Sequence, residues 1–233
     1  MNVTNETNEA NKTIATRLIL VRHAEAEGNV KRIFHAQLAA ESLKNVEIDI
    51  LYSSSLKRTL TTAGYISKVK QLPIIRTDKL KEINGGDWED VAWELLSKKW
   101  PEAYDSWENN PYLHQMPNGE SMKEFQLRLV NEINHIVNDN KEKNICIVTH
   151  GTAIRVLTCY FHHNSLEEIN CIKWVDNTSI TTVDYKDGIF HVVNEGDTSH
   201  LTQNMKTLEN QDWWIEKMSE LNERESDNIG CNE

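Results

Sequence analysis

Two stretches far apart in the sequence share one layout, an apolar run that ends in a histidine. Residues 18–21 are apolar and are followed by Arg22 and His23. Residues 145–148 are also apolar and are followed, after one threonine, by His150. Short apolar runs of this kind predict buried strands, and ligands of open α/β sheets bind just beyond the carboxyl ends of such strands. If both strands belong to one sheet, both imidazoles can reach a single pocket.

The length and composition of the chain predict one medium-sized domain. The 233 residues are enough to bury a core without disulfides or a bound metal. Apolar residues make up 39% of the chain and charged residues 26%, which places it among ordinary globular proteins. The four cysteines form no CxxC pair, which favours reduced thiols over a disulfide framework or a zinc site.

The charge of the chain and its polar start narrow the partners that we expect. The formal net charge of −11 argues against binding to nucleic acid or to an anionic membrane surface. An anionic substrate would therefore need a local cationic pocket. No apolar stretch is long enough to span a bilayer, and the start, rich in Asn and Thr, lacks the apolar core of a signal peptide. We therefore expect a cytoplasmic protein.

Strand-like and helix-like segments alternate along the chain and predict an α/β fold. Strands are predicted at about 18–22, 48–54, 73–77 and 144–149, followed by a hairpin at 178–185 and 189–194. A loop is expected at 24–36, and helices are predicted at about 38–44, 55–69, 121–138 and 151–161, the second of them capped by a serine. We expect a flexible tail at 1–16, a domain at 17–201, and an acidic, partly helical tail at 202–233.

The segment between the third strand and the helix at 121–138 differs from the rest. Residues 80–118 contain short helical pieces and four tryptophans, at positions 88, 93, 100 and 107. We favour core packing for most of these rings. The alternative is a lid over the pocket, whose aromatic and polar side chains select the substrate.

Most of the polar residues that could form a functional site lie in five blocks of sequence. They are residues 20–24 with Asn29, 52–63, 80–89, 117–121 and 148–151. Together these blocks resemble those of the histidine phosphatase superfamily, in its phosphoglycerate mutase-like branch. The resemblance extends from about residue 17 to residue 201. It implies a three-layer α/β/α sandwich with a mostly parallel central sheet and a helical lid insertion at about 80–118.

Two departures from the family pattern stand out. The segment between Asn29 and Ser53 is shorter than usual and lacks the pattern that opens the first helix of the family. The mutases of the family also carry a longer insertion, with a lysine and an arginine pair that hold phosphoglycerate. Residues 88–117 of this chain contain only Lys98 and Lys99 as basic residues. The second departure favours hydrolysis over mutase transfer.

The resemblance implies that His23 accepts the phosphoryl group of the substrate. Glu82 would protonate the leaving alkoxide and then, as a carboxylate, activate the water that cleaves phospho-His23. Glu89 is the nearest alternative for this role. His150 would add a donor to the phosphate. No cofactor is implied, and no spacing of His, Cys and Asp indicates a metal site.

The same resemblance implies a phosphate cradle. Arg22 and Arg58 would supply planar, permanently charged donors for the phosphate oxygens. Asn29, His150 and Gly151 would complete the cradle. Because the negative charge spreads over the equatorial oxygens of the transferring group, such donors carry most of the catalysis.

Three functions follow as hypotheses. The first is a phosphomonoester hydrolase that acts on a small phosphorylated metabolite through phospho-His23. The second is a phosphoglycerate mutase that depends on 2,3-bisphosphoglycerate. The third is a weakly active member that binds phosphorylated ligands, which the shortened first loop would suit.

Overall fold

The structure, a computed structural model, describes residues 14–24 and 30–208. Asn29 lies outside the described residues, as do most of the two predicted tails. The strands are β1 (Thr16–Arg22), β2 (Ile50–Ser54), β3 (Ile74–Thr77), β4 (Asn144–Thr149), β5 (Ile180–Lys186) and β6 (Ile189–Asp197). The α-helices are α1 (Val30–Ser42), α2 (Lys57–Lys70), α3 (Trp93–Lys99), α4 (Pro101–Asn109), α5 (Met122–Asp139) and α6 (Gly151–Phe161). Short 3-10 segments are η1 (Asp78–Leu80), η2 (Gly86–Trp88), η3 (Pro111–Leu113), η4 (Leu166–Cys171) and η5 (Gln203–Met205).

The strands form one sheet in the order β3-β2-β4-β1-β5-β6. The first four strands of that order are parallel, whereas β5 runs antiparallel to β1 and forms a hairpin with β6. The sheet is therefore mostly parallel, as predicted. Because β1 and β4 are neighbours, their carboxyl ends lie at the same edge.

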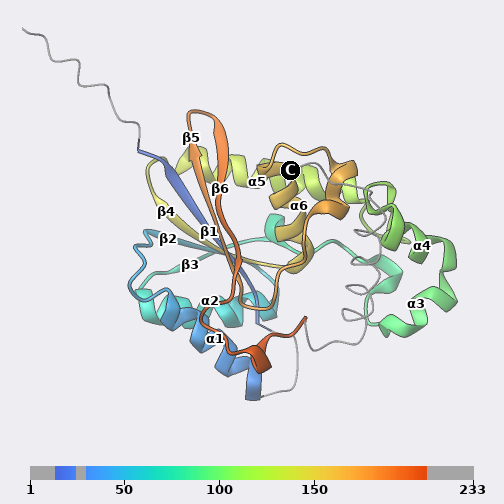
Figure 1. Ribbon diagram of the computed structural model, residues 1–233, viewed down its shortest axis with the longest axis horizontal. Helices are drawn as coiled ribbons and strands as arrows, with labels where there is room; N and C mark the ends of the chain where they lie inside the picture. Colours follow the sequence, from blue (N-terminus) through green and yellow to red (C-terminus); the bar gives the residue numbers. More distant parts are fainter. Residues whose placement is uncertain (1–13, 25–29, 209–233) are drawn as a thin grey trace, which may run out of the picture.

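Side chains of the central strands alternate between two apolar layers, as the two-residue period of a strand requires. One layer packs against α5 and α6 and includes Leu18, Leu20, Ile145 and Ile147. The other packs against α1 and α2 and includes Ile19, Val21, Cys146 and Val148. Figure 1 shows the sheet between these two helix pairs. The predicted three-layer α/β/α sandwich is confirmed.

Helix α1 corrects the sequence-based expectation for the region after β1. A loop was expected at 24–36 and a short helix at 38–44, but the helix spans Val30–Ser42. Its buried apolar residues are Ala36, Ala39, Ala40 and the adjoining Leu43, a spacing of three and four residues that puts them on one face, and His35 is buried beside them. Alanine also has the highest helix propensity. The helix therefore forms and packs on α2 without the family's usual opening pattern.

The tryptophan-rich segment leaves the sheet after β3 and returns at α5. It carries α3 and α4, which form a helical pair to one side of the sheet in Figure 1. The Trp88 ring is buried and contacts the rings of Trp93, Trp107 and His114. Core packing is thus the role of Trp88, whereas Trp93 stays 42% exposed.

The cysteines divide into two groups. Cys146 and Cys159 are free and buried, and burial raises the pKa of Cys146 to about 12 and that of Cys159 to about 11. Both are therefore protonated and unreactive at neutral pH. The expectation of reduced thiols is wrong for Cys171, which is disulfide-bonded and lies exposed at the end of η4.

The last described residues are tied to the body of the domain. One oxygen of the Asp176 carboxylate, Oδ1, accepts hydrogen bonds from the backbone nitrogens of Thr207 (2.7 Å) and Leu208 (3.1 Å). The same oxygen accepts from the Thr207 hydroxyl at 2.6 Å, and the Leu208 side chain is buried. In the described part of the chain, no helix has both the length and the apolar content needed to cross a membrane.

Candidate active site

The structure brings His23 and His150 together at the carboxyl ends of β1 and β4. The two strands pair with Arg22 opposite Thr149, and the His23 backbone nitrogen donates to the Thr149 carbonyl at 3.0 Å. The ring centroids of the two histidines are 5.1 Å apart, with the ring planes at 67°. The register of two parallel strands therefore sets the distance between these imidazoles.

The surroundings of His23 leave one ring nitrogen for chemistry. Its Nδ1 lies 2.5 Å from the Ala24 carbonyl oxygen, so we assign the proton to Nδ1 and the lone pair to Nε2. The His23 carbonyl accepts from the Asn177 side chain at 3.0 Å. Burial, more than the charges of Arg22 and Arg58, lowers the pKa of His23 to about 3. The imidazole is therefore neutral at pH 7, the form that a nucleophile requires.

His150 is buried and held on both sides. Its Nδ1 accepts from Arg58 Nε at 3.2 Å, and its Nε2 lies 2.9 Å from the Ser54 hydroxyl oxygen. Burial is the main cause that lowers its pKa, and the His23 ring and nearby arginines act in the same direction. With Nδ1 as acceptor, the proton lies on Nε2.

Arg58 lies between the two imidazoles. Its Nε is 3.2 Å from His23 Nε2 and 3.2 Å from His150 Nδ1. It occupies the first turn of α2, where the backbone amides and the helix dipole favour an anion. The predicted serine cap of α2 is wrong, because the cap position is Leu56 and makes no side-chain bond. The Ser54 hydroxyl instead contacts His150.

Arg22 is the second cationic group of the site, and it lies against Gly151. Arg22 Nη1 donates to the Val175 carbonyl at 2.5 Å. A Cβ atom at Gly151 would lie 3.1 Å from Arg22 Nε and 3.2 Å from its Cζ. Glycine therefore lets the guanidinium lie against the first residue of α6, another helix N-terminus suited to an anion.

Glu82 follows η1 and reaches the same helix N-terminus. Its Oε2 accepts from the Thr152 backbone nitrogen at 3.2 Å, and its Oε1 accepts from that of Ile83 at 3.0 Å. Burial raises the pKa of Glu82, although these two bonds and Arg58 oppose the rise. The rival Glu89 is exposed and accepts from the Gly85 nitrogen at 3.2 Å. The geometry thus favours Glu82 over Glu89.

The structure adds contacts that the sequence did not single out. Ser54 holds His150, Asn177 holds the His23 carbonyl, and the Thr62 hydroxyl accepts from the Ala24 nitrogen at 3.0 Å. Ser54 and Thr62 lie inside the block at 52–63, but their hydrogen bonds reach His150 and Ala24, which are distant in the sequence. Periodicity alone could therefore not assign these contacts. Of the predicted set, Asn29 falls outside the described residues.

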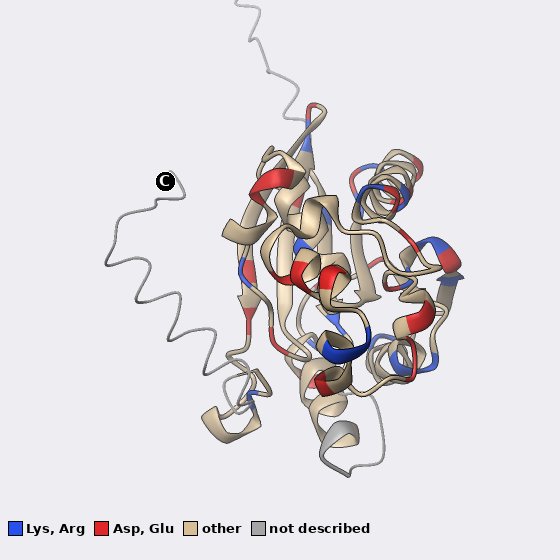
Figure 2. Cartoon of the chain, turned by 90° about the vertical axis from the view of Figure 1, so that its right-hand side faces the viewer, with Lys and Arg blue, Asp and Glu red and all other residues tan. Residues whose placement is uncertain are grey.

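Charge at the site contrasts with charge over the rest of the molecule. Acidic and basic segments are interspersed along the chain in the view of Figure 2. Arg22 and Arg58 lie close enough to the two histidines that their charges lower the pKa of both.

Among the described residues, no three His, Cys, Asp or Glu side chains are grouped so that they could hold a metal ion.

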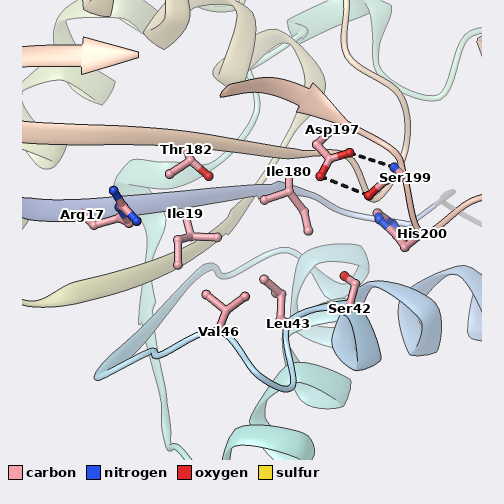
Figure 3. A pocket seen from close by; sticks show the side chains of 10 residues that line it. All are labelled: Arg17, Ile19, Ser42, Leu43, Val46, Ile180, Thr182, Asp197, Ser199 and His200. Carbon is pink, nitrogen blue, oxygen red and sulfur yellow. Dashed lines mark hydrogen bonds between the residues drawn. The ribbon is translucent and has the colours of Figure 1, made fainter. Parts of the chain in front are cut away.

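A separate hollow of about 290 Å³ lies on the α1 side of the sheet. Figure 3 shows it between the end of α1 and strands β1 and β5, with Leu43, Ile180 and His200 in its lining. Arg17, also in the lining, is already paired with Asp184 at 2.7 and 2.8 Å. None of the predicted site residues lines this hollow.

Comparisons with known proteins agree with this geometry. A sequence model of the histidine phosphatase superfamily (branch 1) matches residues 18–198. Phosphoserine phosphatase 1 of Hydrogenobacter thermophilus is 30% identical over 157 residues, which are 61% of this chain and 74% of that protein. Putative phosphoserine phosphatase 2 of the same organism is 30% identical over 181 residues, 72% of this chain and 88% of that protein.

A solved structure gives the same result for the fold. Bacillus stearothermophilus YhfR superposes with a TM-score of 0.76 at 30% identity, covering 80% of this chain and 99% of that chain. The matched range 18–198 contains His23, Arg58, Glu82 and His150. The resemblance drawn from the sequence blocks is confirmed, and the chain belongs to the histidine phosphatase superfamily, branch 1.

Proposed function

We propose that the protein is a phosphomonoester hydrolase that works through a phosphohistidine intermediate on His23. One observation carries the proposal: a neutral His23, fixed through Nδ1, presents Nε2 to Arg58 and lies beside the His150 ring. A nucleophilic nitrogen next to fixed cationic donors is the arrangement that phosphoryl transfer needs.

In the first step, the His23 Nε2 lone pair forms a bond to phosphorus while the bond between phosphorus and the ester oxygen breaks. Glu82 in its protonated form, which burial favours by raising its pKa, gives its proton to the departing oxygen. Arg22 and Arg58 balance the charge on the equatorial oxygens. The two negative charges of the phosphoryl group would also oppose the lowering of the His150 pKa, so that His150 can donate to it.

In the second step, water attacks the phosphorus of phospho-His23. The Glu82 carboxylate takes a proton from that water, the bond between nitrogen and phosphorus breaks, and inorganic phosphate leaves. The enzyme returns to neutral His23 and protonated Glu82, so protons and charge balance over the cycle. No step requires a cofactor.

We propose a small phosphorylated metabolite as the substrate. The relatives named phosphoserine phosphatase support this class of substrate. Hydrolysis is favoured over mutase transfer because Lys98 and Lys99 are the only basic residues of segment 88–117. Both are exposed on α3. The cytoplasmic location that we expect from the sequence stays a prediction. A disulfide bond such as that of Cys171 is rare in the cytoplasm and argues against this location.

Release of phosphate from p-nitrophenyl phosphate tests the proposal. We expect the wild type to release phosphate and His23→Ala to lose the activity by at least about 10³-fold. The matched control is His191→Ala, because His191 is exposed on β6. Equal release by the wild type and His23→Ala would remove the enzymatic proposal and leave the phospho-ligand-binding alternative. Isomerisation of 3-phosphoglycerate in the presence of 2,3-bisphosphoglycerate would instead support the mutase.

A further inference from the structure

Glu120, within the block at 117–121, has a role apart from opening α5. Ser121 and Glu124 make the capping box of that helix between themselves. The Glu120 carboxylate, which precedes α5, instead pairs with Arg128, about two turns further along the chain. Arg128 Nε lies 2.9 Å from Glu120 Oε1, and Nη2 lies 2.8 Å from Oε2. Two parallel bonds of this kind fix the guanidinium plane.

The other donors of Arg128 reach the backbone that carries Glu82. Nη1 donates to the Lys79 carbonyl at 2.8 Å and to the Lys81 carbonyl at 3.2 Å, and Nη2 lies 3.4 Å from the Glu82 carbonyl. Only arginine has several donors in one rigid plane, so a lysine could not make these bonds together.

Glu120 holds the same segment on its other side. Its Oε2 accepts from the Asn84 backbone nitrogen at 3.2 Å, and its own backbone nitrogen donates to the Asn84 carbonyl at 2.9 Å. Arg128 and Glu120, which we call the α5 bracket, thus bind the chain before and after Glu82.

The segment needs such support because residues 81–85 are neither strand nor helix. Leu80 anchors its start, since the Leu80 side chain is fully buried and its carbonyl accepts from the Thr149 hydroxyl at 2.8 Å. Beyond Leu80, the α5 bracket supplies the fixed partners of the backbone at Lys81 and Asn84.

We propose that the α5 bracket positions Glu82 for proton transfer to the leaving group. This inference rests on the proposed function, in which Glu82 is the general acid. Arg128 and Glu120 are positioning residues, because their contacts to the Glu82 segment are made through its backbone. Their loss should therefore weaken proton transfer while leaving the phosphate-binding groups in place.

The test compares two substrates of nearly equal size, p-nitrophenyl phosphate and phenyl phosphate. Nitrophenolate leaves readily without a proton, whereas phenolate leaves much better with one. For Arg128→Lys, we expect kcat/KM for phenyl phosphate to fall on the order of 10-fold to 100-fold. The value for p-nitrophenyl phosphate should stay near that of the wild type. Glu120→Gln is the second variant and should change the ratio of the two values in the same direction.

Arg17→Lys is the matched control. Arg17 makes the same two-bond pairing, with Asp184, but at the opposite end of β1 from His23, and its substitution should leave the ratio unchanged. Retained turnover of p-nitrophenyl phosphate shows that each variant is folded. A ratio that stays at the wild-type value in both bracket variants, whether or not both rates fall, overturns the inference. Activity retained in His23→Ala would overturn the proposed function instead.

Discussion

His23 and Glu82 are brought to the same site by two different kinds of structure. His23 and His150 end paired strands of the sheet, so backbone register sets their separation. Glu82 lies in a segment without regular structure and is held through side chains of α5 and the N-terminus of α6. Positions fixed by a backbone ladder can be read from strand patterns. The sequence names Glu82 through the family resemblance, but the contacts that fix its position appear only in the tertiary structure.

Glu82→Gln removes the candidate general acid and should give the largest fall in kcat/KM. The amide cannot donate a proton to the leaving group or accept one from water, so kcat/KM for phenyl phosphate should fall about 10²–10⁴-fold. Since burial raises the pKa of Glu82 and so favours its protonated form, the wild-type value should fall as pH rises through that pKa. The Glu82→Gln variant should not show this fall of kcat/KM with rising pH. An unchanged pH profile would assign the general acid to another group.

Arg58→Gln tests the part of the site formed by His23 and His150, because Arg58 Nε contacts both rings. Loss of this donor should lower kcat/KM about 10²–10³-fold. It should also raise the pKa of His23 and His150, since the charge of Arg58 lowers both. Steady-state kinetics and NMR titration of the ring protons measure the two effects. Lys57→Gln, exposed one residue earlier in α2, is the control. Unaltered ring titration would mean that Arg58 does not act on the imidazoles.

The buried histidines should make folding stability sensitive to acid. His23 has a folded-state pKa of about 3, below its ordinary value of 6.5, so its contribution is complete above pH 6.5. The contribution is lost as pH falls from 6.5 toward 3, because the unfolded state takes up the proton first. Urea unfolding across this range should show a smaller loss of unfolding free energy for His23→Asn than for the wild type. His191→Asn is the control, and equal slopes for all three proteins would contradict the expectation.

Gly151→Ala should give the smallest effect of the four. A Cβ 3.1 Å from Arg22 Nε forces the guanidinium to shift, which we expect to lower kcat/KM about tenfold. The sheet register is untouched, so thermal unfolding should change little. Gly64→Ala in α2 is the matched control, because its Cβ would meet no atom within 4 Å. Similar kinetics for both variants would show that Arg22 tolerates the displacement.

The elements predicted best are those whose signal lies in local periodicity. The strands near 18–22 and 144–149 and the helices near 121–138 and 151–161 lie close to the observed bounds. Helix α1 was missed at its start, because the buried residues of the helix are His35 and three alanines rather than large apolar residues. The serine cap of α2 failed because Leu56 holds the cap position, while the Ser54 hydroxyl contacts His150 and the Ser55 hydroxyl donates to the Asp78 carboxylate.

The site followed the same division. The sequence brought out His23, Arg58 and His150, which the structure places together, whereas Ser54 and Asn177 emerged only from contacts across the fold. Hydrogen bonds between residues 96 and 154 positions apart leave no trace in local pattern.

The bonds of Asp176 to Thr207 and Leu208 have a consequence for the edge of the catalytic unit. Thr207 Oγ1 also lies 2.8 Å from Asn177 Oδ1, and Asn177 in turn donates to the His23 carbonyl. Thr207 and Leu208, the last described residues, are thereby tied through the side chains of Asp176 and Asn177 to the peptide group of His23. A shortened protein intended to keep full turnover should retain Leu208.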